Sequence, residues 1–358
     1  MRARTLLLLL LFLLLARSMR AQDVRIGVLG IFHPRHLTLS CTGGEALVVA
    51  TADETIFLQP RSSRESLQIR TGGDTLLLSV NGREIHANEI QATSRNNGAA
   101  RFGLGVPGKI RRQYLGTLDV KAIHGELVPA VTLDLETAVA SVVQAESSPG
   151  APLEVLKAQA VVTRSYFVAG GGRHTDFDFC DLTHCQFLRE PPPPESPAAV
   201  AAAATKDLII NFEGKPVAAM FTRSCSGATR TPADIGIPTN GYSYFSVVCV
   251  FCSKNPVHWT RSVSPQDAAL LKDHSEAARL AVGKRLGWSA APSNTFVVHQ
   301  GGGEMVLEGV GQGHGVGLCQ RGARAMAESG ADFRKIILHY FPNTTISQFA
   351  PRHQRRGP

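Results

Sequence analysis

The stretch that decides the fold is LETAVASVVQAESSPGAPLEVLKAQAVVTRSYFVA, Leu135 to Ala169. From Leu135 onward, apolar residues fall at i, i+3, i+4, i+7 and i+8, which is the spacing of an amphipathic helix, and Asp134 can cap its start. A second helix is predicted to open near Pro152 and to close at the glycines 170–172. The segment therefore predicts two helices, each with one buried face.

The first helix ends with an acidic residue on its apolar face. Glu146 lies eleven residues after Leu135, which places it about 20° from Leu135 on a wheel of 3.6 residues per turn. A carboxyl group in a buried setting is expected to have a raised pKa, as a general acid needs near neutral pH. If the helix frays earlier, Glu146 is instead a solvated end.

The second helix carries apolar residues on its predicted inner side: Leu153, Leu156, Ala160 and Phe167. Lys157 and Arg164 are seven residues apart and therefore share one face of this helix. We expect both residues, together with Gln159 between them, to bind substrate.

Strands are predicted on both sides of the helices. From Asp23 to about Asp119 the chain reads as short strands, such as SLQIRT and DTLLLSV, separated by turn signals such as TGGD and VNGRE. Strands resume at DLIINFEG and PVAAMFTRS, after the proline-rich loop EPPPPESP and the short helix AAVAAAAT. The predicted fold class is α+β, with a β-rich N-terminal platform and a mixed α/β core that contains two buried helices and a glycine-rich loop.

The chain begins with the features of a secretory signal. Arg2 and Arg4 precede an apolar run, Leu6 to Leu15, that is short for a membrane span, and cleavage is predicted after Ala21. The alternative is an uncleaved anchor. We expect a secreted or periplasmic, cell-wall-associated protein with no membrane span in the mature chain. The predicted regions are a signal peptide at 1–21, a β-rich region at 22–118, a catalytic core at 119–350 and a basic tail at 351–358.

The net charge limits the kinds of partner that the protein is expected to bind. The whole chain carries a formal charge of +8, and four of its arginines precede residue 22, so the mature chain would carry +4. A mild positive excess suits an anionic polymer. The basic tail lacks the interleaved aromatic residues typical of nucleic-acid binding, so no nucleic-acid partner is expected.

The stretch FDFCDLTHCQF supplies candidate metal ligands. With the preceding His174, it brings Cys180, His184 and Cys185 within twelve residues, a set that can hold zinc tetrahedrally. A disulfide between Cys180 and Cys185 is the alternative, because exported proteins fold in an oxidising compartment. Seven cysteines leave at least one thiol outside any set of disulfides.

Three further cysteine segments have less definite interpretations. CVFC, Cys249 to Cys252, can be a redox pair, half a metal site or a tight disulfide, and a structural role is favoured because no thioredoxin-like pattern surrounds it. Cys225 and Cys319 have no obvious partner in the sequence.

A glycine-rich stretch near the C-terminus, GVGQGHGVGLCQRGA, runs from Gly309 to Ala323. Glycine at this density allows the backbone to approach a ligand, with His314 and Gln320 as hydrogen-bonding side chains, although a tight structural turn gives the same pattern. The stretch matches neither a dinucleotide-binding nor a P-loop pattern. No G-x-S-x-G or H-E-x-x-H occurs, which disfavours a serine hydrolase and a zinc protease.

Taken together, these segments resemble the sporulation stage II protein D family, also called the SpoIID/LytB domain. The blocks LKAQAVVTRSY and GHGVGLCQRGA carry most of the resemblance, which extends from about Arg111 to Ile346. Two departures are Ser147 and Ser148, where the family often has Met-Pro, and Ala228, where it has a second glycine.

The resemblance implies a lytic transglycosylase that cuts peptidoglycan glycan strands, especially strands without stem peptides, with Glu146 as catalytic residue. It implies zinc at the block of His174, Cys180, His184 and Cys185, as in clostridial members, and substrate binding that includes Ser224 with His314 and Gln320. Other family members enhance cell-wall amidases, so a non-catalytic wall-binding protein with an amidase partner is the alternative. A third possibility is an unrelated secreted binding domain held by disulfides.

Overall fold

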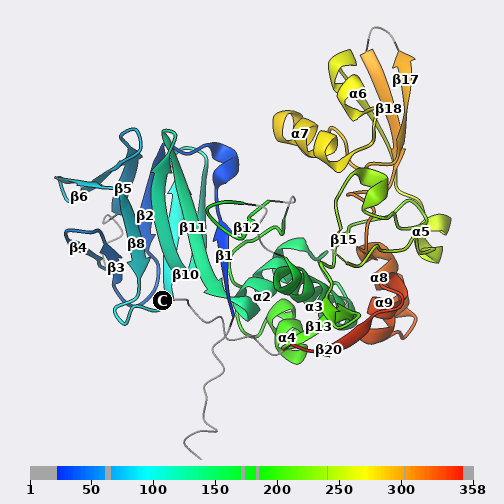
Figure 1. Ribbon diagram of the computed structural model, residues 1–358, viewed down its shortest axis with the longest axis horizontal. Coiled ribbons are helices and arrows are strands. Elements are labelled where there is room, and N and C mark those ends of the chain that lie inside the picture. Colours follow the sequence, from blue (N-terminus) through cyan, green and yellow to red (C-terminus); the bar gives the residue numbers. More distant parts are fainter. Residues whose placement is uncertain are drawn as a thin grey trace, which may run out of the picture.

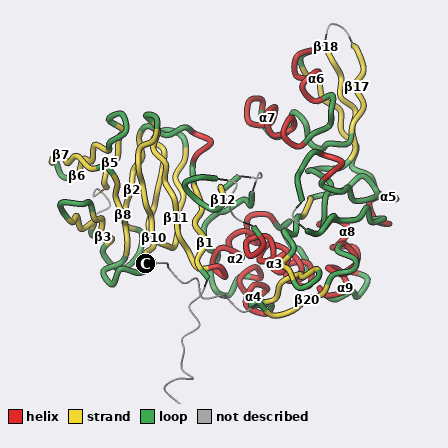
Figure 2. Tube along the Cα trace, in the orientation of Figure 1, coloured by secondary structure: helices red, strands yellow, loops and turns green. Residues whose placement is uncertain are grey.

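The computed structural model describes residues 22–60, 66–170, 174–182, 185–239, 241–301 and 304–349. They form a β-rich platform, a helical core beside it and a small domain that projects from the far side of the core (Figure 1). Figure 2 shows strands concentrated in the platform and helices in the core, which agrees with the predicted α+β class. The predicted signal peptide (1–21) and basic tail (351–358) lie outside the described residues.

The platform is built around one twelve-stranded sheet of main order β12-β1-β11-β10-β9-β2-β5-β6-β7, with β3, β4 and β8 paired off this path. A short 3₁₀ helix, Gly30–Phe32, follows the first strand. The strands before the helices are β1 (Asp23–Gly27), β2 (His36–Cys41), β3 (Leu47–Ala50), β4 (Thr55–Leu58), β5 (Ser66–Thr71), β6 (Leu76–Val80), β7 (Arg83–Ala87), β8 (Glu89–Thr93), β9 (Ala100–Val106), β10 (Ile110–Ile123) and β11 (Glu126–Asp134).

Strand β10 connects the two halves of the platform. The first half of β10 pairs with β9, and its second half pairs with both β11 and β8. The same strand therefore belongs to both halves of the platform sheet. Along most of its length buried and half-buried residues alternate, as expected where one face of a strand packs on a core. The boundary predicted between residues 118 and 119 falls inside this strand.

The two predicted helices are present. α2 (Leu135–Glu146) follows β11 directly, and the Asp134 carboxylate accepts the Thr137 backbone N–H at 3.0 Å. α3 (Leu153–Ala169) runs between Pro152 and Gly170 and is buried over most of its length. The prediction for Leu153 was wrong, because this side chain is 41% exposed in the first turn of α3. The predicted alanine-rich helix is α4 (Pro197–Ala204), which packs against α2 and α3.

The rest of the core brings together segments that are far apart in sequence. β13 (Leu208–Phe212) lies between β14 (Lys215–Pro216) and β20 (Thr345–Gln348). β15 (Phe221–Thr222) pairs in parallel with β19 (Leu318–Cys319), which leads directly into α8. β12 (Phe179–Cys180) pairs in parallel with β1 at the edge of the platform sheet. The remaining core elements are a 3₁₀ turn (Ala233–Ile235), α5 (Val250–Lys254), α8 (Gln320–Glu328) and α9 (Phe333–Tyr340).

The small domain occupies the stretch between α5 and the glycine-rich loop, and the sequence did not predict it as a separate unit. A three-stranded sheet of order β16-β18-β17 packs with two helices around its own apolar cluster, which includes Trp259 and Phe296. Its elements are β16 (His258–Val263), α6 (Pro265–Leu271), α7 (Glu276–Leu286), β17 (Phe296–Gly301) and β18 (Glu304–Val310).

Within the described ranges, no helix combines the length and the apolar character needed to cross a lipid bilayer.

Candidate active site

A cavity of about 890 Å³ lies between the core and the small domain, and Glu146 is one of its lining residues. The core contributes the end of α2, the segment around β15, the glycine-rich loop and the start of α8. The small domain contributes β16, α7 and the loop after α7. The polar and aromatic lining residues include Glu146, Gln186, Arg223, His258, Trp259, Arg261, Glu276, Arg279, Trp288, Gln312, His314 and Gln320.

Glu146 is the last residue of α2, and its side chain is half-buried. Burial raises the pKa of its carboxyl group to about 7, although a backbone hydrogen bond from Phe187 and the charges of Arg223 and Arg189 act in the opposite direction. The raised pKa expected from the helix phase is therefore found. A carboxyl group with this pKa is populated in both protonation states near neutral pH, as general acid and base catalysis requires.

Gln320 connects the glycine-rich segment to the end of α2, where Glu146 lies. It is the first residue of α8, and its side-chain Nε2 donates to the backbone carbonyl of Glu146 at 3.0 Å. The same Nε2 lies 3.3 Å from Oε1 of Gln159, a fully buried residue of α3. Gln159 therefore orients Gln320 and does not itself line the cavity.

The glycine-rich loop follows the segment 220–224 closely. Gly311, Gly313 and Gly317 have φ values of 89°, 94° and 74°, in the left-handed region that favours glycine. A Cβ at Gly313 would lie 2.6 Å from Thr222 Oγ1, and a Cβ at Gly317 would collide with the Met220 carbonyl oxygen. The glycines thus allow two chain segments to pack closely, as in the tight structural turn that was the alternative to ligand binding. The packed segments form one wall of the cavity.

His314 projects from this loop at the cavity wall. Its Nδ1 accepts the Val316 backbone N–H at 3.0 Å, and burial lowers the pKa of the ring. A neutral imidazole whose Nδ1 is an acceptor carries its proton on Nε2. His314 therefore acts as a neutral hydrogen-bonding group near neutral pH.

A second carboxyl group, Glu276 of α7, lines the cavity. Its two oxygens accept from Arg279 Nε and Nη2 at 2.8 and 2.6 Å, and both side chains are nearly buried. A bidentate pair of this kind occupies both oxygens of the Glu276 carboxylate. Of the two carboxyl groups among the described cavity-lining residues, Glu146 is thus the one without a bidentate cationic partner.

Arginine and tryptophan side chains complete the cavity, and no sequence pattern indicated them. Arg223 is exposed and donates at 2.8 Å to the hydroxyl of Ser148, which lies two residues after Glu146 at the end of α2. Trp288 is 38% exposed at the opposite wall, and its ring fits over Gly283 of α7, where a Cβ would lie 2.5 Å from it. The place of Trp288 depends on the small domain, which local periodicity did not reveal, whereas Arg223 directly follows the core strand β15.

Besides Gln159, three other residues predicted to bind substrate do not line the cavity. Arg164 is fully buried, and its guanidinium donates to both carboxylate oxygens of Glu136 at 2.7 and 2.6 Å. Lys157 pairs with Glu154 at 2.7 Å on the outer side of α3. Ser224 is buried, with its hydroxyl next to Cys252. These side chains have structural partners instead.

The predicted metal ligands converge as far as the structure describes them. The ligand atoms of His174, Cys180 and Cys185 all lie within 4.8 Å of one another, and His174 Nε2 is 3.4 Å from Cys185 Sγ. His184 lies outside the described residues. Cys185 also lines the cavity, so this cluster borders the site that contains Glu146. One imidazole and two thiols are a donor set that suits zinc.

Residues 124–212 match the family described as SpoIID: Stage II sporulation protein. This segment contains β11, α2, α3 and α4, and so it includes Glu146. The predicted resemblance to the SpoIID family is confirmed over these residues. The match disfavours the alternative of an unrelated secreted binding domain.

Three relatives extend the comparison. An uncharacterised protein of Brachyspira hyodysenteriae is 25% identical over 272 residues, 66% of this chain and 73% of the relative. Stage II sporulation protein D of Bacillus amyloliquefaciens is 28% identical over 172 residues, 41% of this chain and 49% of the relative. The amidase enhancer of Bacillus subtilis is 33% identical over 64 residues, 18% of this chain and 9% of the relative. The chain thus matches half or less of the length of the two relatives whose names describe a role.

Proposed function

We propose that this chain is a peptidoglycan lytic transglycosylase that cleaves the MurNAc-GlcNAc bond of peptide-free glycan strands and leaves 1,6-anhydro-MurNAc ends. The SpoIID match and the amidase-enhancer relative support a role at the cell wall. The observation that carries the activity is the carboxyl group of Glu146, which lines the cavity and has a pKa raised to about 7.

The reaction needs one group that first gives and then takes a proton. Protonated Glu146 donates to the glycosidic oxygen while the bond from that oxygen to C1 of MurNAc breaks. The C6 hydroxyl oxygen of the same sugar then bonds to C1 and closes the anhydro ring. The carboxylate of Glu146 accepts the hydroxyl proton, which restores its starting state without consuming water.

The arrangement of carboxyl groups favours this reaction over hydrolysis. Glycoside hydrolases generally use two carboxyl groups across the scissile bond, one as acid and one as base or nucleophile. Here the second carboxyl group of the cavity, Glu276, is held by Arg279. An internal hydroxyl nucleophile requires no second carboxylate, so Glu146 alone is sufficient.

The other cavity residues suit a peptide-free strand. Removal of a stem peptide exposes the lactyl carboxylate of MurNAc, and the exposed guanidinium of Arg223 can pair with it. The partly exposed ring of Trp288 offers an apolar face on which a sugar ring can pack. Gln320 and His314 supply hydrogen-bonding groups on the core side.

We further propose that the cluster of His174, Cys180 and Cys185 binds zinc, with His184 as the expected fourth ligand. The convergence of three ligand atoms supports this proposal. A closed structural zinc would fix the loop that carries Cys185 and Gln186 at the cavity. Elemental analysis should find zinc that is lost in Cys180→Ser, and a disulfide between Cys180 and Cys185 in metal-free protein would refute the proposal.

A secreted or cell-wall-associated location belongs to the same proposal and rests on the sequence of residues 1–21. Fractionation of cells that express the full chain should find a shortened form outside the cytoplasm. A full-length cytoplasmic form would contradict it.

The alternative function is a non-catalytic protein that enhances a cell-wall amidase, which the similarity to the amidase enhancer of Bacillus subtilis favours. Mass spectrometry of fragments released from purified peptidoglycan, with and without stem peptides, separates the two. A transglycosylase releases anhydro-MurNAc products from the peptide-free strands without any partner. An enhancer releases none and instead increases the amidase-dependent release of stem peptides.

A further inference from the structure

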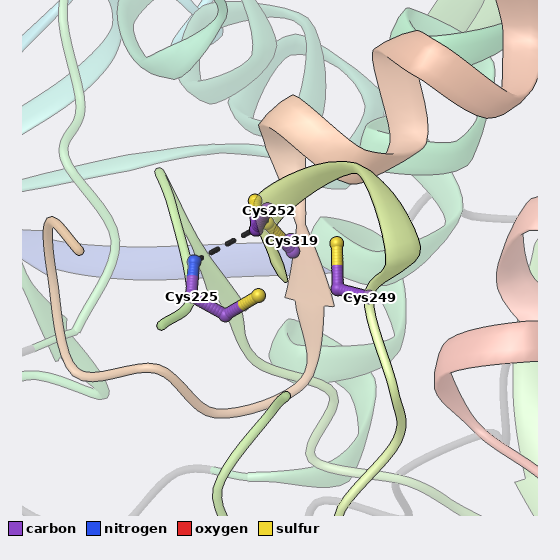
Figure 3. Close-up of side chains that lie close together, drawn as sticks. All are labelled: Cys225, Cys249, Cys252 and Cys319. Atoms are coloured by element: carbon purple, nitrogen blue, oxygen red, sulfur yellow. Dashed lines mark hydrogen bonds between the residues drawn. The ribbon is translucent and has the colours of Figure 1, made fainter. Parts of the chain in front are cut away.

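Four cysteines from separate parts of the core meet at one point, away from the cluster that contains His174. Cys225 follows β15, Cys249 and Cys252 flank the start of α5, and Cys319 ends β19 (Figure 3). Their four Sγ atoms all lie within 4.8 Å of one another. Their exposed fractions are 1%, 2%, 0% and 0%, so the sulfurs are closed off from solvent.

The spacing fits a single tetrahedral metal ion. Zinc bonds thiolate sulfur at about 2.3 Å, which separates two sulfurs of a regular tetrahedron by about 3.8 Å. Cys252 Sγ and Cys319 Sγ are 3.6 Å apart, far longer than a disulfide bond of about 2.05 Å. An iron–sulfur cluster places several metal atoms between its cysteines and needs them further apart than one ion does.

Hydrogen-bonding groups surround the sulfurs and can stabilise them as thiolates. The backbone N–H of Cys225 donates to Cys319 Sγ at 3.3 Å, as the dashed line in Figure 3 marks. Tyr340 Oη lies 3.5 Å from Cys249 Sγ, and Ser224 Oγ lies 3.7 Å from Cys252 Sγ. Such donors stabilise the negative charge of metal-bound thiolates and fix their orientation.

The surrounding backbone is packed tightly on the cluster. A Cβ at Gly322, in the first turn of α8, would collide with both Cys249 Sγ and Tyr340 Oη. Glycine at this position therefore allows α8 to approach the sulfurs. Gln320, which follows Cys319 directly and contacts Glu146, lies on the same turn.

We propose that Cys225, Cys249, Cys252 and Cys319 form a closed structural zinc site, separate from the cluster of His174, Cys180 and Cys185. Two residues separate Cys249 from Cys252, the spacing of a zinc knuckle, and the other two ligands come from strand ends. Binding releases the thiol protons and ties α5, the segment after β15 and the start of α8 together. The proposal does not depend on the catalytic activity.

The test uses the full chain with the Cys180→Ser and Cys185→Ser substitutions, which remove the thiolates of the other cluster. We expect about one zinc per chain by elemental analysis and four sulfur neighbours by X-ray absorption, as a closed four-thiolate site requires. The four cysteines should resist alkylation until the zinc is removed and then react without a reductant. Cys41, on the platform strand β2, is the internal control and should react from the start.

Three results would overturn the proposal. The first is labelling of the four cysteines only after reduction, which would indicate two disulfides. The second is iron in place of zinc. The third is immediate labelling of all four thiols in folded protein that takes up no added zinc. These measurements use protein in which all four cysteines are intact. They therefore test the zinc site without relying on a ligand variant, such as Cys225→Ser, that can fail to fold.

Discussion

The side-chain amide of Gln320 donates a 3.0 Å hydrogen bond to the backbone carbonyl of Glu146, which joins residues 174 positions apart. A carbonyl at the end of a helix has no partner within that helix. Gln320 supplies the partner and, through Gln159 of α3, ties α8 to both predicted helices. The position of the helix end that carries Glu146 thus depends on an element near the other end of the chain.

Gln320→Ala should reduce turnover about fivefold, because it removes a hydrogen bond of about 1 kcal/mol that positions Glu146. The measurement is the rate of anhydro-MurNAc release, with Gln348→Ala on the exposed strand β20 as the control. Equal rates in both variants would show that Gln320 does not position Glu146.

Local sequence patterns predicted those features of the fold that depend only on residues close together in the chain. The phase of Leu135 and Glu146 on one helix was sufficient to predict a buried carboxyl group with a raised pKa, and Asp134 marked the start of that helix. The turn signals TGGD and VNGRE also marked the ends of β5 and β6. These features are decided within one or two turns of chain, which is the range that periodicity can read.

The other features of the fold and of the site depend on contacts between residues that are far apart in the sequence. Arg164 and Lys157 share a helix face by spacing, but the packing of α4 on α3 buries Arg164 and leaves Lys157 at the surface side. The sequence identified CVFC as half of a possible metal site, whereas Cys225 and Cys319 lie too far along the chain for spacing to assign them. Glu276 and Trp288 join the cavity only because the small domain folds over it.

Arg164→Ala should lower the free energy of unfolding by about 3 kcal/mol, because it leaves Glu136 without its buried partner. Lys157→Ala is the matched control on the same helix, and its half-exposed pair with Glu154 should change stability by less than about 1 kcal/mol. Chemical denaturation measures both. An Arg164→Ala protein with unchanged stability and a raised KM would restore the predicted role in substrate binding.

Glu146→Gln should lose about 100-fold or more in turnover, the scale of acid and base catalysis, because the amide cannot transfer a proton. Glycan binding should persist, since the side chain keeps its shape and its hydrogen-bonding capacity. Glu328→Gln, on the exposed face of α8, is the control. Near wild-type release of anhydro-MurNAc by folded Glu146→Gln would mean that another group is the acid.

The pH dependence of turnover should reflect the same carboxyl group. Because the first step needs protonated Glu146, kcat/KM should fall as the pH rises through about 7, the pKa to which burial raises this group. An initial-rate profile on peptide-free strands from pH 5 to pH 9 measures it. A rate that stays constant across this range would exclude Glu146 as the proton donor.

Stability should change with pH in a related way. A carboxyl group whose pKa is raised from its ordinary value of 4.5 to about 7 binds more proton in the folded than in the unfolded chain between these pH values. Its contribution to stability is therefore complete below about pH 4.5 and is lost as the pH rises through about 7. Glu146→Gln carries no charge at this position and should escape the loss. The gap in unfolding free energy between variant and wild type should therefore widen in favour of the variant from pH 5 to pH 8. A gap that is constant with pH in denaturation experiments would show that Glu146 titrates normally, and the buried environment argued for its carboxyl group would be wrong.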